Sequence, residues 1–189
     1  MAEKTVTFVT GNLNKLREAQ SIVSRFSAPV ALVHRGIDLD EIQGSVDEIA
    51  EAKCRQAAAI IGGPTLIEDT SLGFRAMGGL PGPYVKWFMK ALGAPQLPRM
   101  LADFDDKHAT AMCVMAYTEG PGAPIHVFKG TCDGRIVTAS GPTTFGWDCV
   151  FAPEGQDGKT FAEMTPEAKN QISHRSKAFK MLAAFFANA

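Results

Sequence analysis

The stretch "TVTFVTGNLNKLREAQSIVSRF", residues 5–26, decides the fold class because its hydrophobic period changes part-way along. Residues 5–10 are rich in β-branched side chains, which is typical of a short buried strand. From residue 11 the apolar positions recur at helical spacing, so we expect an amphipathic helix. The buried face of that helix would carry Leu13, Leu16, Ala19, Gln20 and Val23. A strand followed directly by a helix indicates a mixed α/β fold.

Strand and helix patterns alternate along the rest of the chain. Further strands are expected at residues 30–35, 65–69, 108–118 and 125–137. The last two, 108–118 and 125–137, are expected to be long and antiparallel to each other. The strand at 65–69 would end in two carboxylates, and Asp133–Gly134 is a candidate turn inside the last strand.

Helices are expected after a Ser45–Glu48 capping box, from Tyr84 to Gly93, and over the tail from Thr165 and Pro166. Their buried positions would be Ile49, Ala52, Ala57, Ile60 and Ile61 in the first helix and Phe179, Leu182, Ala183 and Phe186 in the tail. No repeat or long linker divides the chain, so we expect one domain over residues 1–189.

Composition excludes several classes of protein. The chain carries 19 basic and 20 acidic residues, which is not the basic excess of a nucleic-acid-binding protein. Its four cysteines form no C-x-x-C pair, so neither a zinc site nor dithiol chemistry is indicated. The N-terminal segment lacks the apolar region of a signal peptide, and no apolar run could span a bilayer. We therefore expect a cytoplasmic protein with no nucleic-acid or membrane partner.

The turn "TGNLNK", residues 10–15, joins the first strand to the first helix. A helix N-terminus favours phosphate, and Thr10, Asn12 and Lys15 could add donors and a positive charge. The spacing is not that of a P-loop. Two interpretations remain at this point, a phosphate-binding turn and an ordinary turn in which Asn12 is the N-cap.

Acidic residues cluster at 38–44 and 67–71, in or beside expected loops. Strand alternation places Glu68 and Asp69 on opposite faces, so only one of them would face a given site. Mg²⁺ is usually held by one or two carboxylates together with substrate phosphates, and Glu41 and Asp69 are suitable in type. The plain alternative is that these acids are solvated.

Three helical lysines could serve a phosphate-rich ligand, namely Lys53, Lys86 and Lys169. Helical lysines usually extend to solvent, but several directed at one cleft would bind a polyphosphate. In "ISHRS", residues 172–176, the Arg175 guanidinium matches the acceptors on a purine edge. Alternatively, Ser173 begins a new helix and leaves His174 and Arg175 exposed.

The segment "FGWDCVF", residues 145–151, combines aromatic residues with a glycine and an acid. Core packing would explain Phe145 and Trp147 but leaves Asp148 without an explanation. In a nucleoside pocket, Phe145 would stack on the base, Gly146 would allow close approach, and Asp148 would accept from a ring N–H.

In order along the chain, these motifs resemble the inosine triphosphate pyrophosphatase family in its eukaryotic branch. The resemblance covers nearly the whole chain through "TFVTGNLNK", "LDEIQG", "EAKC", "LIEDTSLGF", "GGLPGPYVKWF", "FGWDCVF" and "AEMTPEAKNQISHRSKA". One departure is Cys149, where the family usually has proline. The resemblance implies an elongated two-lobed α/β fold, with a long central mixed sheet flanked by helices and an active-site cleft between the lobes. It also implies a homodimer.

The resemblance further implies a reaction, the hydrolysis of ITP, dITP and XTP to the monophosphate and pyrophosphate with Mg²⁺, or with Mn²⁺ in its place. Catalytic roles would fall to Glu41, Lys53 and Asp69, and the metal would be held by Glu41 and Asp69. Substrate contacts would come from Thr10, Gly11, Asn12, Lys15, Lys53, Thr70, Lys86, Phe145, Gly146, Trp147, Asp148, Lys169, Ser173, His174 and Arg175.

Selectivity would depend on the purine 6-position, where hypoxanthine and xanthine present an acceptor and adenine a donor. Donors from His174 or Arg175 would suit the former. Two other classes remain open: an enzyme of the same chemistry with a different target, such as a modified pyrimidine or a dinucleotide, and a non-catalytic nucleotide sensor or RNA-binding module.

Overall fold

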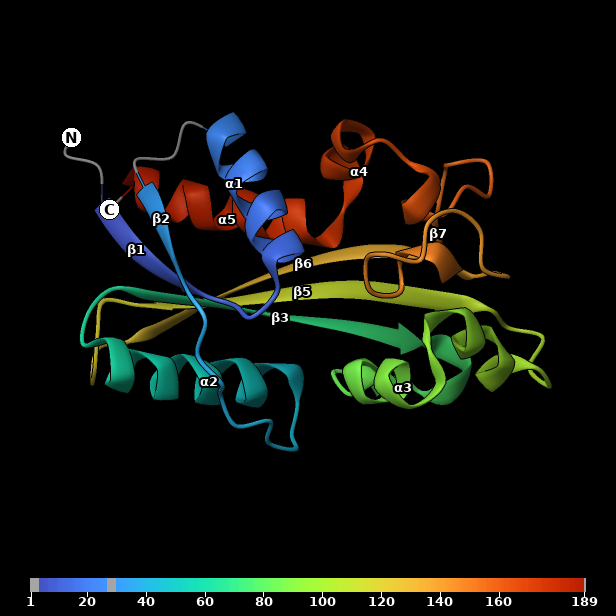
Figure 1. Cartoon of the computed structure of the whole chain (residues 1–189), viewed down its shortest axis with the longest axis horizontal. Helices are drawn as coiled ribbons and strands as arrows, with labels where there is room; N and C mark the ends of the chain where they lie inside the picture. Colours follow the sequence, from blue (N-terminus) through green and yellow to red (C-terminus); the bar gives the residue numbers. More distant parts are fainter. Residues whose placement is uncertain (1–3, 27–29, 189) are drawn as a thin grey trace. The chain divides into compact units, whose positions relative to one another are not determined.

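The computed structural model describes residues 4–26 and 30–188 and confirms the mixed α/β class (Figure 1). Its strands are β1 (Lys4–Val9), β2 (Val30–Arg35), β3 (Thr65–Phe74), β4 (Pro81–Gly82), β5 (His108–Thr118), β6 (Ile125–Ile136) and β7 (Phe151–Pro153). Its α-helices are α1 (Leu13–Phe26), α2 (Val46–Ile61), α3 (Val85–Leu92), α4 (Pro166–Ile172) and α5 (His174–Asn188). Short 3₁₀ segments include Ala94–Leu101 and Asp148–Val150.

The strands form one mixed sheet in the order β2-β1-β3-β5-β6-β7, with β4 paired to β3. β1 runs parallel to both β2 and β3, whereas β4 is antiparallel to β3 and β7 is antiparallel to β6. The chain forms two compact units. Unit 1 comprises Met1–Asp69, Cys113–Gly130 and Arg175–Ala189, and unit 2 comprises Thr70–Met112 and Thr131–His174.

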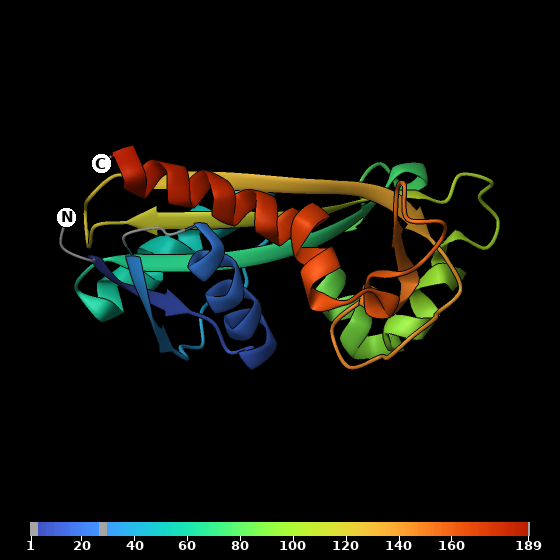
Figure 2. The same cartoon turned by 90° about the horizontal axis from the view of Figure 1, so that it is seen from above.

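In unit 1, α1 and α5 cover one face of the sheet and α2 covers the other (Figure 1). The view from above onto the first face shows both covering helices (Figure 2). Phe8 of β1 and Phe179 of α5 are buried and meet edge to face, with ring centroids 6.4 Å apart. Burial of such side chains, at roughly 1.5–3 kcal/mol each, holds the helices on the sheet.

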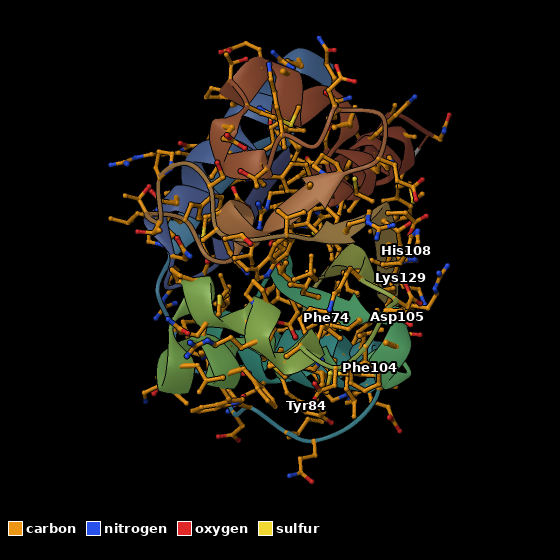
Figure 3. All side chains as sticks on the ribbon, turned by 90° about the vertical axis from the view of Figure 1, so that its right-hand side faces the viewer. Phe74, Tyr84, Phe104, Asp105, His108 and Lys129 are labelled. Atoms are coloured by element: carbon orange, nitrogen blue, oxygen red, sulfur yellow. The ribbon has the colours of Figure 1, made fainter. Side chains whose placement is uncertain are left out.

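Unit 2 has its own core, in which Phe74 and Phe151 are fully buried. Its surface carries a polar cluster, in which Arg75 donates to Asp106 and contacts His108 Nδ1 at 2.8 Å. Figure 3 shows His108 at the outer edge of this unit and Phe74 nearer its centre. No helix among residues 4–26 and 30–188 is long and apolar enough to cross a membrane.

Several local predictions are confirmed. Ser45 and Glu48 form the capping box of α2, and that helix ends at Gly62 in the left-handed conformation. Thr165 is the N-cap of α4, with Pro166 at its first position. Gly93 ends α3. These features depend on neighbouring residues alone, which is why sequence spacing was sufficient to locate them.

Two strand predictions are wrong in detail. β3 does not end at the two carboxylates but continues to Phe74, because "TSLGF" supplies buried Leu72 and Phe74 to the core of unit 2. Glu68 and Asp69 therefore lie in the middle of a strand. Asp133–Gly134 is not a turn, because β6 runs straight through it. A side chain at Gly134 would collide with the carbonyl of Ala152 and the ring of Phe151.

The expected buried faces of the helices also need correction. Leu13 and Gln20 of α1 are exposed, whereas Ala19 is buried as predicted, Leu16 and Val23 are partly buried, and Ile22 is buried in addition. Ile60 of α2 is half exposed.

The tail forms two helices instead of one. Ser173 has extended backbone angles (φ −65°, ψ 152°) and separates α4 from α5. The interpretation that a new helix begins after Ser173 is therefore correct, but its corollary is wrong, because His174 and Arg175 are both buried. Phe179, Leu182 and Phe186 are buried as predicted, and Ala183 is partly buried.

Candidate functional site

The β1–α1 turn is capped by its own side chains. Thr10 is buried, and its Oγ1 accepts from the amide of Asn12 at 3.1 Å. Asn12 Oδ1 accepts from the amides of Asn14 at 2.9 Å and Lys15 at 3.4 Å. Asn12 thus caps α1, as the plainer interpretation predicts. Gly11 is exposed, with open space around its Cα.

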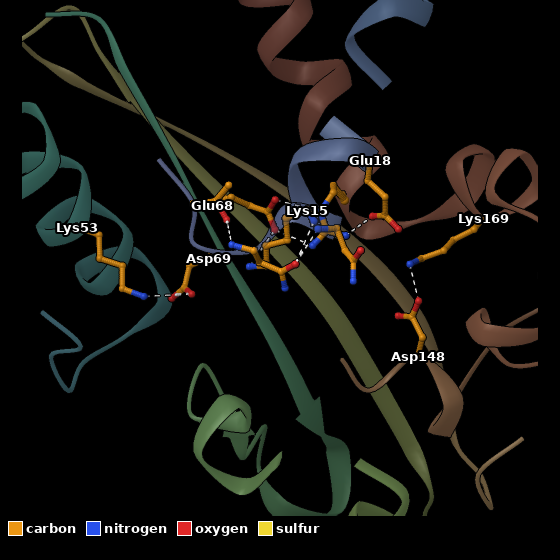
Figure 4. A network of polar contacts seen from close by, with 11 residues as sticks. Lys15, Glu18, Lys53, Glu68, Asp69, Asp148 and Lys169 are labelled. Carbon is orange, nitrogen blue, oxygen red and sulfur yellow. Dashed lines mark hydrogen bonds and ion pairs between the residues drawn. The ribbon is translucent and has the colours of Figure 1, made fainter. Parts of the chain in front are cut away.

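A largely buried ion network joins residues of α1, β3 and α5 (Figure 4). Arg175 of α5 donates from Nε and Nη2 to the two carboxylate oxygens of Glu68, at 3.0 and 2.8 Å. Arg175 Nη1 also donates to Glu18 of α1, and Lys15 Nζ lies 3.3 Å from Glu68 Oε1. Bidentate pairing satisfies charges that would otherwise be costly to bury.

These carboxylate partners keep the buried guanidinium of Arg175 in its charged form. Burial works against the charged form, but Glu68 and Glu18 outweigh it and hold the pKa of Arg175 well above its usual value. The expectation that Arg175 contacts a purine stays a prediction, and in this structure its guanidinium is engaged by two carboxylates.

The three residues expected to be catalytic come together in unit 1. Lys53 is buried on α2, and its Nζ lies 2.9 Å from Glu41 Oε2. The same Nζ lies 3.4 Å from Asp69 Oδ1 (Figure 4). Desolvation raises the pKa of Asp69, although Lys53 and Lys15 act in the opposite direction. A carboxyl group with a raised pKa beside an ammonium is a suitable proton acceptor near neutral pH.

Strand alternation separates the two neighbouring acids, as predicted. Glu68 binds Arg175 and Lys15, whereas Asp69 contacts Lys53. The adjacent residues thus serve two different clusters of unit 1.

A second buried ion pair lies in unit 2. Lys169 Nζ donates to Asp148 Oδ2 at 2.6 Å, and both side chains are buried. The same ammonium lies 4.4 Å from the ring centroid of Phe145 and 5.4 Å from that of Phe161. This pair gives Asp148 a partner within a packed unit, so packing also accounts for its burial, and its role in a nucleoside pocket stays a prediction.

The other residues of "FGWDCVF" have different surroundings. Trp147 belongs to the core of unit 2 and packs against Phe151 at 5.5 Å between ring centroids. Phe145 is partly buried, and Gly146 is exposed with φ 54°, a backbone conformation that favours glycine. Cys149, at the position where the family usually has proline, is a buried free thiol whose pKa is raised by that burial.

The beginning of α5 adds two further residues to unit 2. Ser173 is fully buried, and its amide donates to Lys169 O at 2.9 Å. The His174 ring lies 5.3 Å from Trp147 and 5.9 Å from Phe161, centroid to centroid. Thr70 is partly buried in β3, and Lys86 is exposed on α3 with its Nζ over the Trp87 ring.

The predicted site residues are thus divided between the two units. Unit 1 holds Thr10, Gly11, Asn12, Lys15, Glu41, Lys53, Asp69 and Arg175. Unit 2 holds Thr70, Lys86, Phe145, Gly146, Trp147, Asp148, Lys169, Ser173 and His174.

The donor set of unit 1 suits a hard divalent cation that also binds substrate. Residues 4–26 and 30–188 contain no cluster of three or more His, Cys, Asp or Glu side chains that could hold a metal by themselves. Glu41 and Asp69 nevertheless converge on one ammonium, so their oxygens already accept one cationic group. Two carboxylates completed by phosphate oxygens and water are a usual Mg²⁺ environment.

Sequence reasoning missed Glu18, which contacts Arg175. A signal was available, because Glu18 follows Lys15 by three residues and so shares its face of the predicted helix. Sequence reasoning also set Glu68 aside, and its role as the acceptor for Arg175 depends on a contact across 107 residues.

Comparisons with known proteins agree with this arrangement. The Ham1 family model matches residues 6–185. The chain is 49% identical to an inosine triphosphate pyrophosphatase of Scheffersomyces stipitis, over 96% of this chain and 97% of that protein. It resembles the structure of a HAM1 protein from Coxiella burnetii, with a TM-score of 0.84, 26% identity and coverage of 98% and 100% of the two chains.

A third similar protein is a nucleoside-triphosphatase, or dITP/XTP pyrophosphatase, of Mycobacterium abscessus. Its structure has a TM-score of 0.72 and 25% identity, covering 94% of this chain and 98% of that one. A family match over nearly the whole chain and a shared fold lead to one conclusion. The chain belongs to the Ham1 family.

Proposed function

We propose that this chain is a Mg²⁺-dependent nucleoside triphosphate pyrophosphatase that hydrolyses ITP, dITP and XTP to the monophosphate and pyrophosphate. The observation that carries the proposal is the convergence of Glu41 and Asp69 on Lys53. Support also comes from the 49% identity with an inosine triphosphate pyrophosphatase over nearly the entire chain.

In the proposed reaction, water attacks the α-phosphorus and the bond to the bridging oxygen of the leaving pyrophosphate breaks. Asp69 orients the water and accepts its proton, a role that its raised pKa favours. Lys53 holds Asp69 and Glu41 in place and adds positive charge near the phosphates. Positioning and charge stabilisation account for most of the catalysis of phosphoryl transfer.

Glu41 and Asp69 would hold Mg²⁺, and Mn²⁺ has the same preference for oxygen ligands. When bound, the ion supplies positive charge to the triphosphate. Lys15 and the β1–α1 turn would contact phosphate oxygens, assisted by Lys86.

The nucleoside would be recognised by the aromatic and polar residues of the two motifs near the C-terminus. Phe145 would stack on the base, and Asp148 would accept from a ring N–H. His174 and Arg175 would donate toward the 6-oxo group, which adenine lacks. A site that depends on such a hydrogen bond can reject the analogue by about 10⁴-fold or more.

We also propose that the protein acts in the cytoplasm, as a homodimer. The family resemblance and the composition support this. Light scattering during gel filtration tests the dimer, since a mass near twice the 20.2 kDa of one chain is expected.

The deciding experiment measures binding and turnover of ITP, dITP, XTP, ATP, GTP, a modified pyrimidine triphosphate and a dinucleotide with Mg²⁺, with separate assays for pyrophosphate and orthophosphate. Pyrophosphate from the first three, with ATP and GTP nearly untouched, is expected. Orthophosphate as first product would move the attack to the γ-phosphorus and overturn the mechanism. Turnover of a pyrimidine or dinucleotide alone would indicate a different target, and tight nucleotide binding without turnover would indicate a sensor.

A further inference from the structure

The loop between β2 and α2, residues 36–44, carries a proposed metal ligand but has no regular secondary structure to hold it in place. It carries Glu41, yet residues 36–43 have no helical or strand structure and most are exposed. Asp69 is different, because its backbone is fixed within β3. A carboxylate on an exposed loop must be restrained if it is to remain beside Lys53 and Asp69.

The residue before Glu41 provides such a restraint. The amide of Asp40 donates to Gln56 Oε1 at 2.9 Å, and Gln56 Nε2 donates back to Asp40 Oδ2 at 3.2 Å. One glutamine thus holds both the backbone and the side chain of Asp40. Two hydrogen bonds to one residue fix its position and its orientation together.

Gln56 is well placed for this task. It follows Lys53 by three residues on α2, so the two side chains share a helix face. Lys53 contacts Glu41 while Gln56 contacts Asp40, so neighbouring residues of α2 hold neighbouring residues of the loop. The amide of Gln56 is uncharged, so it restrains the loop without changing the charge around Glu41 and Asp69.

We propose that Gln56 is a positioning residue that acts through Asp40 to hold the Glu41 carboxylate ready for a divalent cation. The effect on metal affinity and the catalytic consequence rest on the proposed function, whereas the restraint on the loop does not. Without Gln56, Glu41 keeps its ion pair with Lys53, but the backbone beside it loses two hydrogen bonds and must be ordered further each time a metal binds. Metal affinity therefore falls, while the chemical step at saturating metal changes little.

Three variants test this. Gln56→Ala removes both hydrogen bonds and keeps a good helix former, so α2 stays intact. Asp40→Asn keeps an acceptor for Gln56 Nε2 and the backbone donor, so it should behave like the wild type. Arg55→Ala is the matched control, because Arg55 is an exposed neighbour on α2 whose ion pair with Glu51 spans 4.0 Å.

Two readouts require no enzymatic turnover. Amide hydrogen exchange at Asp40, followed by NMR, reports the restraint directly. Titration with Mn²⁺, followed by electron paramagnetic resonance, reports metal affinity. In Gln56→Ala we expect the Asp40 amide to exchange faster, because its acceptor is gone. The Mn²⁺ Kd should rise about tenfold, the scale found when partners of metal ligands are removed. Asp40→Asn and Arg55→Ala should remain within about twofold of the wild type on both measures.

A third readout is the Mg²⁺ dependence of ITP hydrolysis. The Mg²⁺ concentration for half-maximal rate should rise about tenfold in Gln56→Ala, with kcat at saturating Mg²⁺ within about twofold of the wild type. If the wild type does not hydrolyse ITP, the proposed function fails, but the exchange and Mn²⁺ measurements still decide the role of Gln56.

A double-mutant cycle shows whether Gln56 acts through Glu41. In a Glu41→Ala background, Gln56→Ala should leave Mn²⁺ affinity unchanged. An equal further loss in that background would overturn the proposal. Faster exchange at Asp40 with unaltered Mn²⁺ affinity would also overturn it, as would absence of Mn²⁺ binding by the wild type.

Discussion

Two buried lysines of this protein have different surroundings. In unit 1, Lys53 contacts the carboxylates of Glu41 and Asp69, so these three side chains bring one positive charge to two negative ones. In unit 2, Lys169 pairs with Asp148 at 2.6 Å and lies against the rings of Phe145 and Phe161. The Lys53 cluster has a net negative charge that can attract a cation, whereas the Lys169–Asp148 pair is electrically neutral.

The difference in net charge between the two lysine clusters indicates which of them can bind a metal ion and take part in catalysis. A matched pair among aromatic rings stabilises a fold and orients its neighbours. A cluster with excess carboxylate is stabilised further by a metal ion, and desolvation has already raised the pKa of one of its acids. Altering the Lys53 cluster should therefore reduce activity with little loss of stability, whereas breaking the Lys169–Asp148 pair should reduce stability in addition to nucleoside binding.

The largest effect is expected for Asp69→Asn. It removes the proton acceptor and one metal ligand while keeping the shape of the side chain, so kcat for ITP should fall at least about 10³-fold. Circular dichroism and the melting temperature should remain close to those of the wild type. Asp47→Asn is the control, because Asp47 is a partly exposed acid of unit 1 that pairs with Lys129. Near-normal turnover by Asp69→Asn would remove Asp69 from the mechanism.

The next effect is expected for Lys169→Met, which leaves Asp148 buried without its ammonium partner. The free energy of unfolding should fall by about 3 kcal/mol, as found when one member of a buried ion pair is removed. Urea denaturation measures this, and a second substitution, Asp148→Asn, should restore much of the loss.

The exposed pair of Lys129 with Asp47 is the control for this measurement. Lys129→Met should cost less than about 1 kcal/mol. If Lys169→Met costs no more than Lys129→Met, the Lys169–Asp148 pair does not stabilise unit 2 more than an exposed pair does.

The smallest effect concerns pH. Burial raises the pKa of Asp69, and only its ionised form can accept a proton or hold a cation. As pH falls, kcat/KM for ITP should begin to decline above the usual aspartate range near about 3.9. Lys15→Met should move this decline to higher pH, because Lys15 lowers the pKa of Asp69. An unmoved acid limb in that variant would contradict the assignment.

The same shift has a consequence for stability with a defined sign. A carboxyl group whose pKa is higher in the folded state binds more protons when folded than when unfolded. Its contribution to the free energy of unfolding therefore falls as pH rises from the unfolded pKa to the folded pKa. Asp69→Asn should remove that decline, which urea denaturation at several pH values would reveal.

Sequence alone predicted the features that depend on near neighbours. The capping box of Ser45 and Glu48 and the N-cap at Thr165 are local patterns, and the opposite orientations of Glu68 and Asp69 follow from strand geometry. Contacts between distant segments were not predictable. Arg175 meets Glu68 across 107 residues, and nothing near either residue indicates this partner. The ion pair of Asp148 with Lys169 is a further case, and it changed the explanation of Asp148.

Gly134 has a consequence for the assembly of unit 2. It lies opposite Pro153, and a Cβ there would meet the carbonyl of Ala152 and the ring of Phe151. Sliding β7 along β6 by one residue would bring Asp133 or Arg135 to the place that only a glycine fits. Gly134 thus fixes the register of β7 against β6. Because β7 directly follows the segment of Trp147 and Asp148, the register of β7 also sets where that segment lies within unit 2.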